Sequence, residues 1–175
     1  MSRDEEFGAY VAQRRPYLYA SAWLLCGDPH RAEDLVQETL AKLYVAWPRV
    51  SRVENVDGYV RRMLVNGHID DGRRPWRRER LTAEPPDAPA ASDPYEDSDE
   101  LWGALRALPA GQRRVVILRH YWGLSIQETA NDLGVSVGTV KRQTSVALAM
   151  LRHVLATEPA ATVKTTIGNL TGEPR

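Results

Sequence analysis

The sequence predicts an all-α protein made of two small helical domains, and three observations carry this prediction. Apolar residues recur at helical spacing along most of the 175 residues. No segment alternates apolar and polar residues over the length of a strand with enrichment in β-branched side chains. An acidic, proline-containing stretch at residues 81–97 lacks apolar periodicity and separates two groups of expected helices.

The distribution of charge is uneven, although the formal net charge is zero. Residues 81–100 contain seven acidic and no basic side chains, whereas residues 56–80 and 101–157 have net charges of +3 and +5. Two basic blocks on either side of an acidic one indicate contact with nucleic acid. The acidic stretch is expected to be a solvated spacer, or a segment that imitates nucleic acid inside a basic channel. The expected organisation is a first domain at 1–80, a flexible acidic linker at 81–97, a second domain at 98–157 and a flexible tail at 158–175.

Local signals divide the first domain into helices. Asp28 and Pro29 are typical of an N-cap followed by proline at the first helical position. The helix that they open has a continuous apolar face, and Pro48 is expected to end it. A loop at Arg49–Asn55 then precedes a further helix, which starts at Val56 and leads into a cluster of arginines.

The second domain contains the pattern of a helix-turn-helix. Ser125 and Glu128 predict a capping box that opens a helix. Gly134 is expected to end that helix, where the turn requires a left-handed backbone conformation. Val135 is expected to be an apolar plug after the turn, and Ser136 to cap the next helix. The second helix of such a motif enters a major groove with its N-terminal end first.

The outward face of this second helix is basic and polar. Lys141 and Arg142 can reach phosphates or guanine edges, and the backbone N–H groups of Gly138 and Thr139 are expected to be open to a phosphate. A helical hairpin with a charged, solvated face is the alternative interpretation. The candidate DNA-binding residues are Gly138, Thr139, Lys141, Arg142 and Ser145, with Val146 at the margin of the face.

The composition excludes several other classes of protein. A single cysteine, Cys26, rules out an intrachain disulfide framework and a multi-cysteine zinc site, and its apolar neighbours predict an inert side chain. No stretch approaches the roughly 18 consecutive apolar residues of a membrane span, and the acidic first residues are unlike a signal peptide. A cytoplasmic protein without membrane insertion is therefore expected.

Five motifs occur in an order and at a spacing that resemble a known family. Two lie in the first domain: Asp34-x-x-Gln37-Glu38 and Asn66-x-x-x-Asp70-x-x-Arg73-Arg74. Three lie in the second: Leu108-Pro109-x-x-Gln112-Arg113, Gly123-Leu124-Ser125-x-x-Glu128-x-Ala130 and Val137-Gly138-Thr139-Val140-Lys141. Together they resemble regions 2 and 4 of the extracytoplasmic-function (ECF) sigma factors, the small members of the sigma-70 family.

The resemblance implies a dissociable promoter-specificity subunit of bacterial RNA polymerase, which carries no catalytic residue and no cofactor. Asp34, Gln37 and Glu38 share one exposed helical edge by their spacing. The resemblance implies that this edge docks on the clamp helices of the β′ subunit. It also implies that the second domain binds the β flap and the −35 element of promoter DNA. An anti-sigma factor is a further candidate partner.

The resemblance places recognition and melting of the −10 element in the loop Arg49–Asn55 and the helix from Val56. A flipped base needs a stacking surface, and single-stranded backbone needs arginines. Trp47, Tyr59 and Trp76 are candidate stacking residues, although each is also a candidate core residue. The candidate −10 residues are Asn66, Asp70, Arg73, Arg74, Arg77 and Arg78.

Two places depart from the family pattern. An aromatic residue is frequent in the family where Thr39-Leu40 follows Asp34-x-x-Gln37-Glu38. Val146 stands where members of the family often have arginine, so part of the usual −35 contact is expected to be missing or apolar.

Two other functions compete with this interpretation. A helix-turn-helix regulator would bind duplex DNA without polymerase, usually as a dimer. An enzyme is the second alternative, because His68-x-Asp70-Asp71 is compatible with a metal site. One histidine and two carboxylates beside many arginines are more typical of ion pairs, so no metal is expected.

Overall fold

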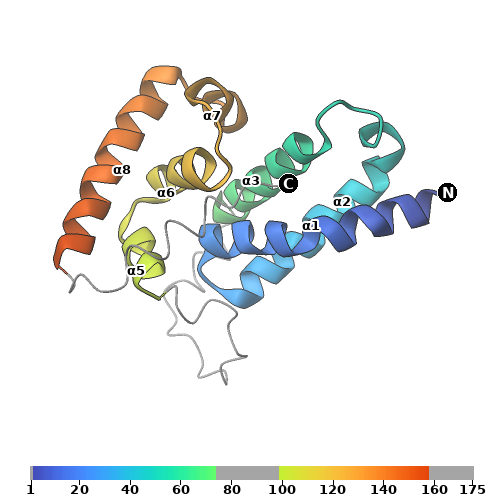
Figure 1. Ribbon diagram of the computed structural model, residues 1–175, viewed down its shortest axis with the longest axis horizontal. Coiled ribbons are helices and arrows are strands. Elements are labelled where there is room, and N and C mark those ends of the chain that lie inside the picture. Colours follow the sequence, from blue (N-terminus) through green and yellow to red (C-terminus); the bar gives the residue numbers. More distant parts are fainter. Residues whose placement is uncertain (1, 74–98, 158–175) are drawn as a thin grey trace. The chain divides into compact units, whose positions relative to one another are not determined.

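The computed structural model describes residues 2–73 and 99–157. Within these residues every regular element is helical, and the chain divides into two compact units (Figure 1). The predicted fold class of two helical domains is therefore confirmed. The expected linker and tail lie outside the described residues, as do Arg74, Trp76, Arg77 and Arg78.

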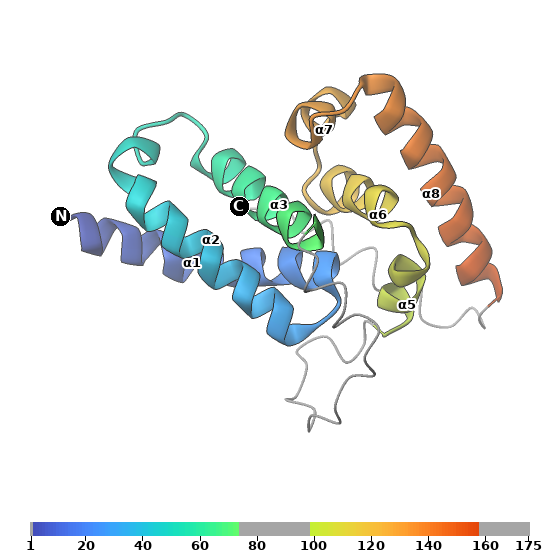
Figure 2. The same cartoon turned by 180° about the vertical axis from the view of Figure 1, so that it is seen from behind.

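The first unit consists of three helices: α1 (Arg3–Cys26), α2 (Pro29–Val50) and α3 (Val56–Arg73). The chain reverses after α1, so α2 packs back along it, and both helices contact α3 (Figures 1 and 2). Gly27 makes this reversal possible because its φ of 66° lies in the left-handed region. Asp28 then caps α2 by accepting a hydrogen bond of 2.7 Å from the N–H of Arg31, as the sequence predicts.

The prediction that Pro48 ends α2 is wrong, because the helix continues to Val50 with Pro48 inside it. Proline has no N–H, so it leaves the carbonyl of Tyr44, four residues earlier, without its helical donor. The Arg3 guanidinium donates a hydrogen bond to this carbonyl. A side chain from the start of α1 thus replaces the hydrogen bond that proline removes.

One face of α2 forms much of the core of the first unit. Leu35, Val36 and Leu43 are fully buried, and Trp47 is only 3% exposed. The Trp47 ring lies against those of Phe7 and Tyr10, with centroids 5.3 Å and 5.1 Å away. Trp47 is therefore a core residue and cannot serve as a stacking surface for a base.

Asp57 ties α3 to α1. The Tyr10 hydroxyl donates to Asp57 Oδ1 at 2.9 Å, and the Arg14 guanidinium pairs with the other carboxylate oxygen. Burial and the negative charge of Asp57 raise the pKa of Tyr10 far above its usual range. Just before Asp57, the Asn55 side chain accepts from the N–H of Gly58 at 2.7 Å. A Cβ at Gly58 would lie 2.8 Å from this side chain, so glycine lets the cap form.

The second unit consists of α5 (Asp99–Ala107), α6 (Ala110–Val116), a π-helical turn (Ile117–Tyr121), α7 (Ile126–Leu133) and α8 (Val137–Thr157). The helical stretch from Ala110 to Tyr121 is thus α-helical only in its first part. Its last residues widen into the π turn, in which the Trp122 N–H donates to the Ile117 carbonyl at 3.1 Å. Among the described residues, no helix combines the length and apolar character that a bilayer span requires.

We expect Leu43→Ala to lower the free energy of unfolding of the first unit by about 2–5 kcal/mol, because a fully buried side chain is replaced by a cavity. Val45→Ala is the matched control, since Val45 is 77% exposed and should change this free energy by less than about 0.5 kcal/mol. Urea unfolding followed by circular dichroism measures both. Equal effects of the two variants would contradict the assignment of the core face of α2.

Candidate nucleic-acid interface

The helix-turn-helix predicted from the sequence is formed by α7 and α8. The Ser125 hydroxyl accepts from the Glu128 N–H at 3.1 Å, and the Glu128 carboxylate accepts from the Ser125 N–H at 2.7 Å. This capping box satisfies two backbone groups at the start of α7. Gly134 ends the helix with a φ of 64°, in the left-handed region that the turn requires.

The two helices meet through a small apolar core. Val115, Ala130 and Val140 are buried together, so α6, α7 and α8 each contribute one side chain. The small side chain of Ala130 lies directly in this contact. Partly buried apolar residues surround it: Ile126, Leu133 and Val137. The position of α8 relative to α7 is therefore fixed by packing within the second unit.

The prediction that Val135 plugs the turn is wrong. Its N–H donates to the Ala130 carbonyl at 3.1 Å, while its side chain remains 38% exposed. The apolar closure comes from Leu133 and Val137 on either side of the turn. The sequence pattern identified an apolar position correctly but not the direction of its side chain.

The start of α8 offers fewer free backbone donors than the sequence suggests. The Ser136 hydroxyl accepts from the Thr139 N–H at 3.1 Å and lies 2.8 Å from the Thr139 hydroxyl. The expected cap at Ser136 is thus formed, and it occupies the Thr139 N–H. Thr139 is also half-buried, whereas Gly138 is exposed. In this part of the described chain, Gly138 is the better candidate for a backbone contact to phosphate.

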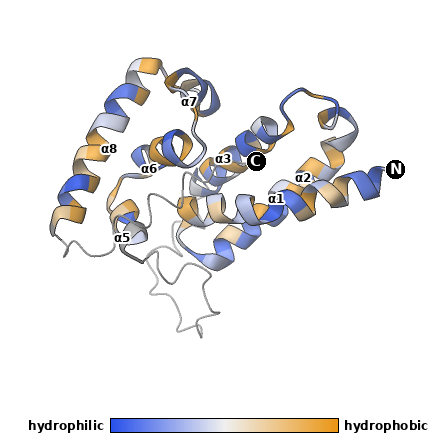
Figure 3. Cartoon of the chain, in the orientation of Figure 1, coloured by the Kyte–Doolittle hydropathy of each residue, from blue (hydrophilic) through white to orange (hydrophobic). Residues whose placement is uncertain are grey.

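The outer face of α8 carries the basic residues predicted for DNA binding. Lys141, Arg142 and Ser145 are all exposed, while Val140 and Ala147 on the opposite side are buried. Hydrophobic and hydrophilic bands alternate along α8 in Figure 3. The spacing therefore places these polar side chains on one accessible face, as predicted.

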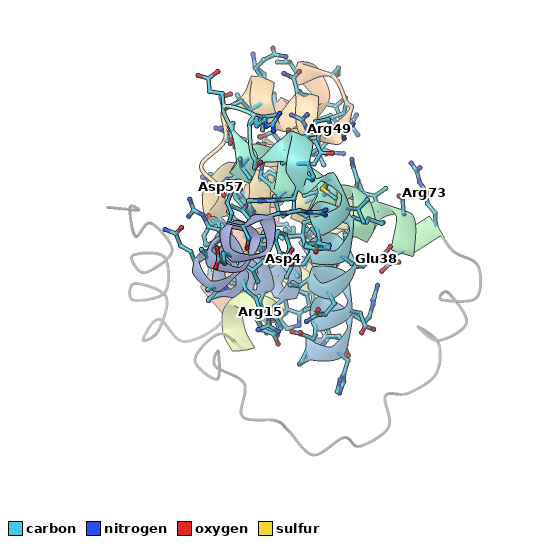
Figure 4. All side chains as sticks on the ribbon, turned by 90° about the vertical axis from the view of Figure 1, so that its right-hand side faces the viewer. Asp4, Arg15, Glu38, Arg49, Asp57 and Arg73 are labelled. Atoms are coloured by element: carbon cyan, nitrogen blue, oxygen red, sulfur yellow. The ribbon has the colours of Figure 1, made fainter. Side chains whose placement is uncertain are left out.

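The edge predicted to bind polymerase lies on the exposed side of α2. Asp34 and Gln37 are exposed and Glu38 is half-buried. Glu38 makes an ion pair of 2.8 Å with Lys42, which lies one turn further along the helix. In Figure 4, Glu38 lies to the right of α2 and Asp57 to its left, so this edge is separate from the contact between α1 and α3.

The same side of α2 contains an apolar residue that the sequence analysis missed. Val45 is 77% exposed and lies seven residues beyond Glu38, two helical turns along the face. A large apolar residue outside the buried stripe is the signal that could have identified it.

The outward face of α3 contains the described members of the predicted −10 set. Asn66, Asp70 and Arg73 are exposed at intervals of four and three residues, which places them on one side of the helix. Arg62 is exposed one turn before Asn66 on the same side, and the sequence analysis did not single it out. The neighbouring Arg61 is instead 8% exposed, so helical periodicity separates the two arginines.

The loop before α3 lies next to a tyrosine and an arginine. The Arg49 guanidinium donates to the Tyr59 hydroxyl at 3.2 Å, which links the end of α2 to the first turns of α3. Tyr59 is half-buried, so its ring remains a candidate stacking surface, unlike that of Trp47. Residues 52–55 of the loop are exposed.

The structure also brings Cys26 near a histidine. The Cys26 sulfur lies 3.7 Å from His68 Nδ1, and Cys26 is half-buried. Within residues 2–73 and 99–157, no group of three or more His, Cys, Asp or Glu side chains has an arrangement suited to a metal ion. His68, Asp70 and Asp71 do not form such a group, and Asp71 is 7% exposed while Asp70 is exposed.

Two helical units, one of them with a helix-turn-helix that has a basic outer face, are typical of a DNA-binding protein. Comparisons with known proteins identify the family. The sequence model described as Sigma-70 region 2 matches residues 10–78, and that described as Sigma-70, region 4 matches residues 98–151.

Similar proteins cover nearly the same length. The RNA polymerase sigma-E factor of Streptomyces coelicolor is 38% identical over 157 residues, which cover 86% of each chain. The ECF RNA polymerase sigma factor EcfG of Rhodopseudomonas palustris is 30% identical over 167 residues, 87% of this chain and 90% of that protein. The sigma factor RpoE from Bartonella quintana, solved in complex with the anti-sigma factor NepR, has a TM-score of 0.70 and 26% identity, and the match covers 88% of this chain and 99% of that one.

The chain belongs to the ECF sigma factors of the sigma-70 family. It is a promoter-specificity subunit of RNA polymerase, and a regulator that acts without polymerase is not favoured.

We expect substitutions at the two glycines of the helix-turn-helix to have opposite effects. Gly134→Ala should lower the free energy of unfolding of the second unit by about 1–2 kcal/mol, because its φ of 64° is strained for an L-residue. Gly138→Ala should raise it by about 0.4–1 kcal/mol, because Gly138 is helical and its Cβ would have room. If Gly138 faces the DNA backbone as predicted, Gly138→Ala should nevertheless weaken promoter binding, because its methyl group would hinder the approach of a phosphate.

Urea unfolding and promoter binding by the polymerase complex measure the two properties separately. If Gly138→Ala binds promoter DNA as well as the unaltered chain, then Gly138 does not face the DNA backbone.

Proposed function

We propose that this sigma subunit divides its work among three exposed faces. The face of α2 docks on the polymerase core, the face of α3 with the preceding loop reads and helps melt the −10 element, and the face of α8 reads the −35 element. The observation that carries the proposal is that each candidate set shares one exposed side of a helix whose other side is buried.

The docking role of α2 is supported by the accessibility of its polar residues. Glu38 pairs with Lys42 one turn along the same helix, and Gln37 donates a hydrogen bond to Glu33 within that helix. Exposed pairs of this kind contribute only about 0.3–0.5 kcal/mol to stability. Exchange of the Glu38–Lys42 pair for a basic group on the clamp helices of β′ would therefore cost the fold little.

The −10 role of α3 is supported by the side chains on its outer side, which include both an amide and guanidinium groups. Asn66 can hydrogen-bond to a base edge, and Arg62 and Arg73 can pair with the backbone of an opened strand. The exposed loop residues 52–55 directly precede α3. Arg74, Arg77 and Arg78 extend the basic sequence beyond the described residues, and we assign them to the same opened strand.

The −35 role of α8 is supported by the geometry of the helix-turn-helix. Lys141 and Arg142 lie in the first two turns of a recognition helix, where side chains reach base edges and phosphates. Gly138 allows close approach of the DNA backbone at the positive end of the helix dipole. We assign contact with the β flap to this second unit as well.

The proposal also includes the partners and location of the chain. The similar RpoE of Bartonella quintana was solved with an anti-sigma factor, and we propose that an anti-sigma factor also binds this chain and controls its release. We further propose that the chain works in the cytoplasm, and that it has no catalytic residue, cofactor or metal ion of its own. The chemistry of RNA synthesis then belongs entirely to the polymerase core.

Run-off transcription with purified polymerase core tests the function directly. We expect the chain to confer initiation from specific promoters, and Glu38→Lys to weaken binding to the core by about tenfold or more, because a charge on the docking face is reversed. The thermal unfolding midpoint should remain nearly unchanged. Glu6→Lys is the matched control, because Glu6 is an exposed acid on α1 outside this face.

The expected result for Glu6→Lys is normal affinity for the core and normal initiation. Tight promoter binding by the chain alone, with no new transcript on addition of the core, would overturn the sigma mechanism. A large loss of stability in Glu38→Lys with normal core affinity would overturn only the role of α2.

Substitutions on the two proposed DNA-binding faces should impair different steps of initiation. Arg142→Ala should relax sequence preference at one or two −35 positions by about 1–3 kcal/mol, because base contacts discriminate between sequences. Arg73→Ala with Arg74→Ala should leave −35 preference intact but reduce open-complex formation and its salt dependence. Permanganate footprinting of melted thymines, together with a −35 mutation scan on each holoenzyme, measures both. Loss of melting in Arg142→Ala with unchanged −35 preference would show that the roles are assigned wrongly.

A further inference from the structure

The outer face of α8 contains an apolar side chain among its polar ones. Val146 is 44% exposed, and it lies one helical turn beyond Arg142 and directly after Ser145. The buried stripe of the same helix passes through Val140, Ala147 and Leu151, so Val146 takes no part in the core. An aliphatic group in this position gains free energy only when a bound partner removes it from water.

Val146 is placed to meet bases rather than only backbone. Arg142, Ser145, Val146 and Ala149 are all exposed, and their intervals of three, one and three residues put them on one side of the helix. A recognition helix in the major groove presents side chains at this spacing to successive base pairs. Arg142, one helical turn before Val146, makes the surface beside it basic, which complements DNA.

The chemistry of the groove then limits what Val146 can recognise. Base edges in the major groove present hydrogen-bond donors and acceptors, which an isopropyl group cannot bind, and one apolar group, the 5-methyl of thymine. Contact between Val146 and this methyl group removes both apolar surfaces from water. Replacement by cytosine would instead place an amino group and a bare ring edge against the valine.

We propose that Val146 is a specificity-determining residue that selects thymine at one position of the −35 element through its 5-methyl group. The proposal rests on the proposed role of α8 in −35 recognition and adds the base that this residue reads. An arginine in this place would bind a phosphate or guanine, so valine changes the preferred sequence rather than only removing a contact.

Deoxyuridine provides the test, because it pairs like thymidine but lacks the 5-methyl group. The −35 sequence is first selected by the holoenzyme from a library randomised at that element, and each selected thymine on either strand is then replaced singly by deoxyuridine. We expect one replacement to weaken promoter binding by about three- to fivefold, which corresponds to the free energy gained when one methyl group is removed from water. Val146→Ala should reduce this penalty to less than about twofold.

Met150→Ala is the matched control, since Met150 is another exposed apolar residue one turn further along α8, at 37% exposure. It should retain the full deoxyuridine penalty. Circular dichroism should show that both variants fold normally, because both side chains are exposed.

Two results would overturn the proposal. In the first, the selected element contains no thymine at which the methyl group matters. In the second, Val146→Ala retains the penalty; if this variant also weakens assembly with the polymerase core, Val146 is a protein contact instead. A holoenzyme that selects no −35 sequence at all would contradict the proposed function itself, and so is distinguishable from these results.

Discussion

Each unit of the protein depends on one long helix that must bury an apolar side while its other side stays in water. In the first unit α2 buries Leu35, Val36 and Leu43 against its neighbours, and in the second α8 buries Val140 and Ala147. A small unit has too few residues to cover both sides of such a helix. The outer sides are therefore left accessible by the same geometry that builds the cores, and the candidate binding residues lie on them.

Much of this architecture could be predicted because it is encoded locally. The starts of α2 and α7 are specified by Asp28 and by the pair Ser125 and Glu128, whose side chains bond to backbone groups three residues away. Gly134 marks the turn because few other residues adopt its backbone conformation. The exposed edges of α2, α3 and α8 follow from periodicity alone, although their binding roles remain predictions.

The errors arose where distant or competing contacts decide the outcome. Pro48 stays inside α2 because Arg3, 41 residues away from Tyr44, supplies the missing donor. For Trp47 the sequence allowed a stacking role or a core role, and rings from α1 decide for the core. At the start of α8, the Ser136 hydroxyl could accept a hydrogen bond from the N–H of Gly138 or of Thr139. It accepts from Thr139, so one donor expected to face DNA is occupied. Local signals thus located these positions but did not determine their partners.

The contact between Arg3 and Tyr44 has a practical consequence for handling the protein. It makes the first turn of α1 part of the support for the last turn of α2, from which the loop at residues 51–55 departs. Arg3 also lies over the Tyr44 ring at 4.3 Å, and Asp4 accepts a hydrogen bond from the hydroxyl of that ring. An affinity tag fused at Met1 that pulls these two residues aside would loosen a loop assigned to promoter recognition. Tags and fluorescent labels for transcription assays therefore belong at the opposite end of the chain.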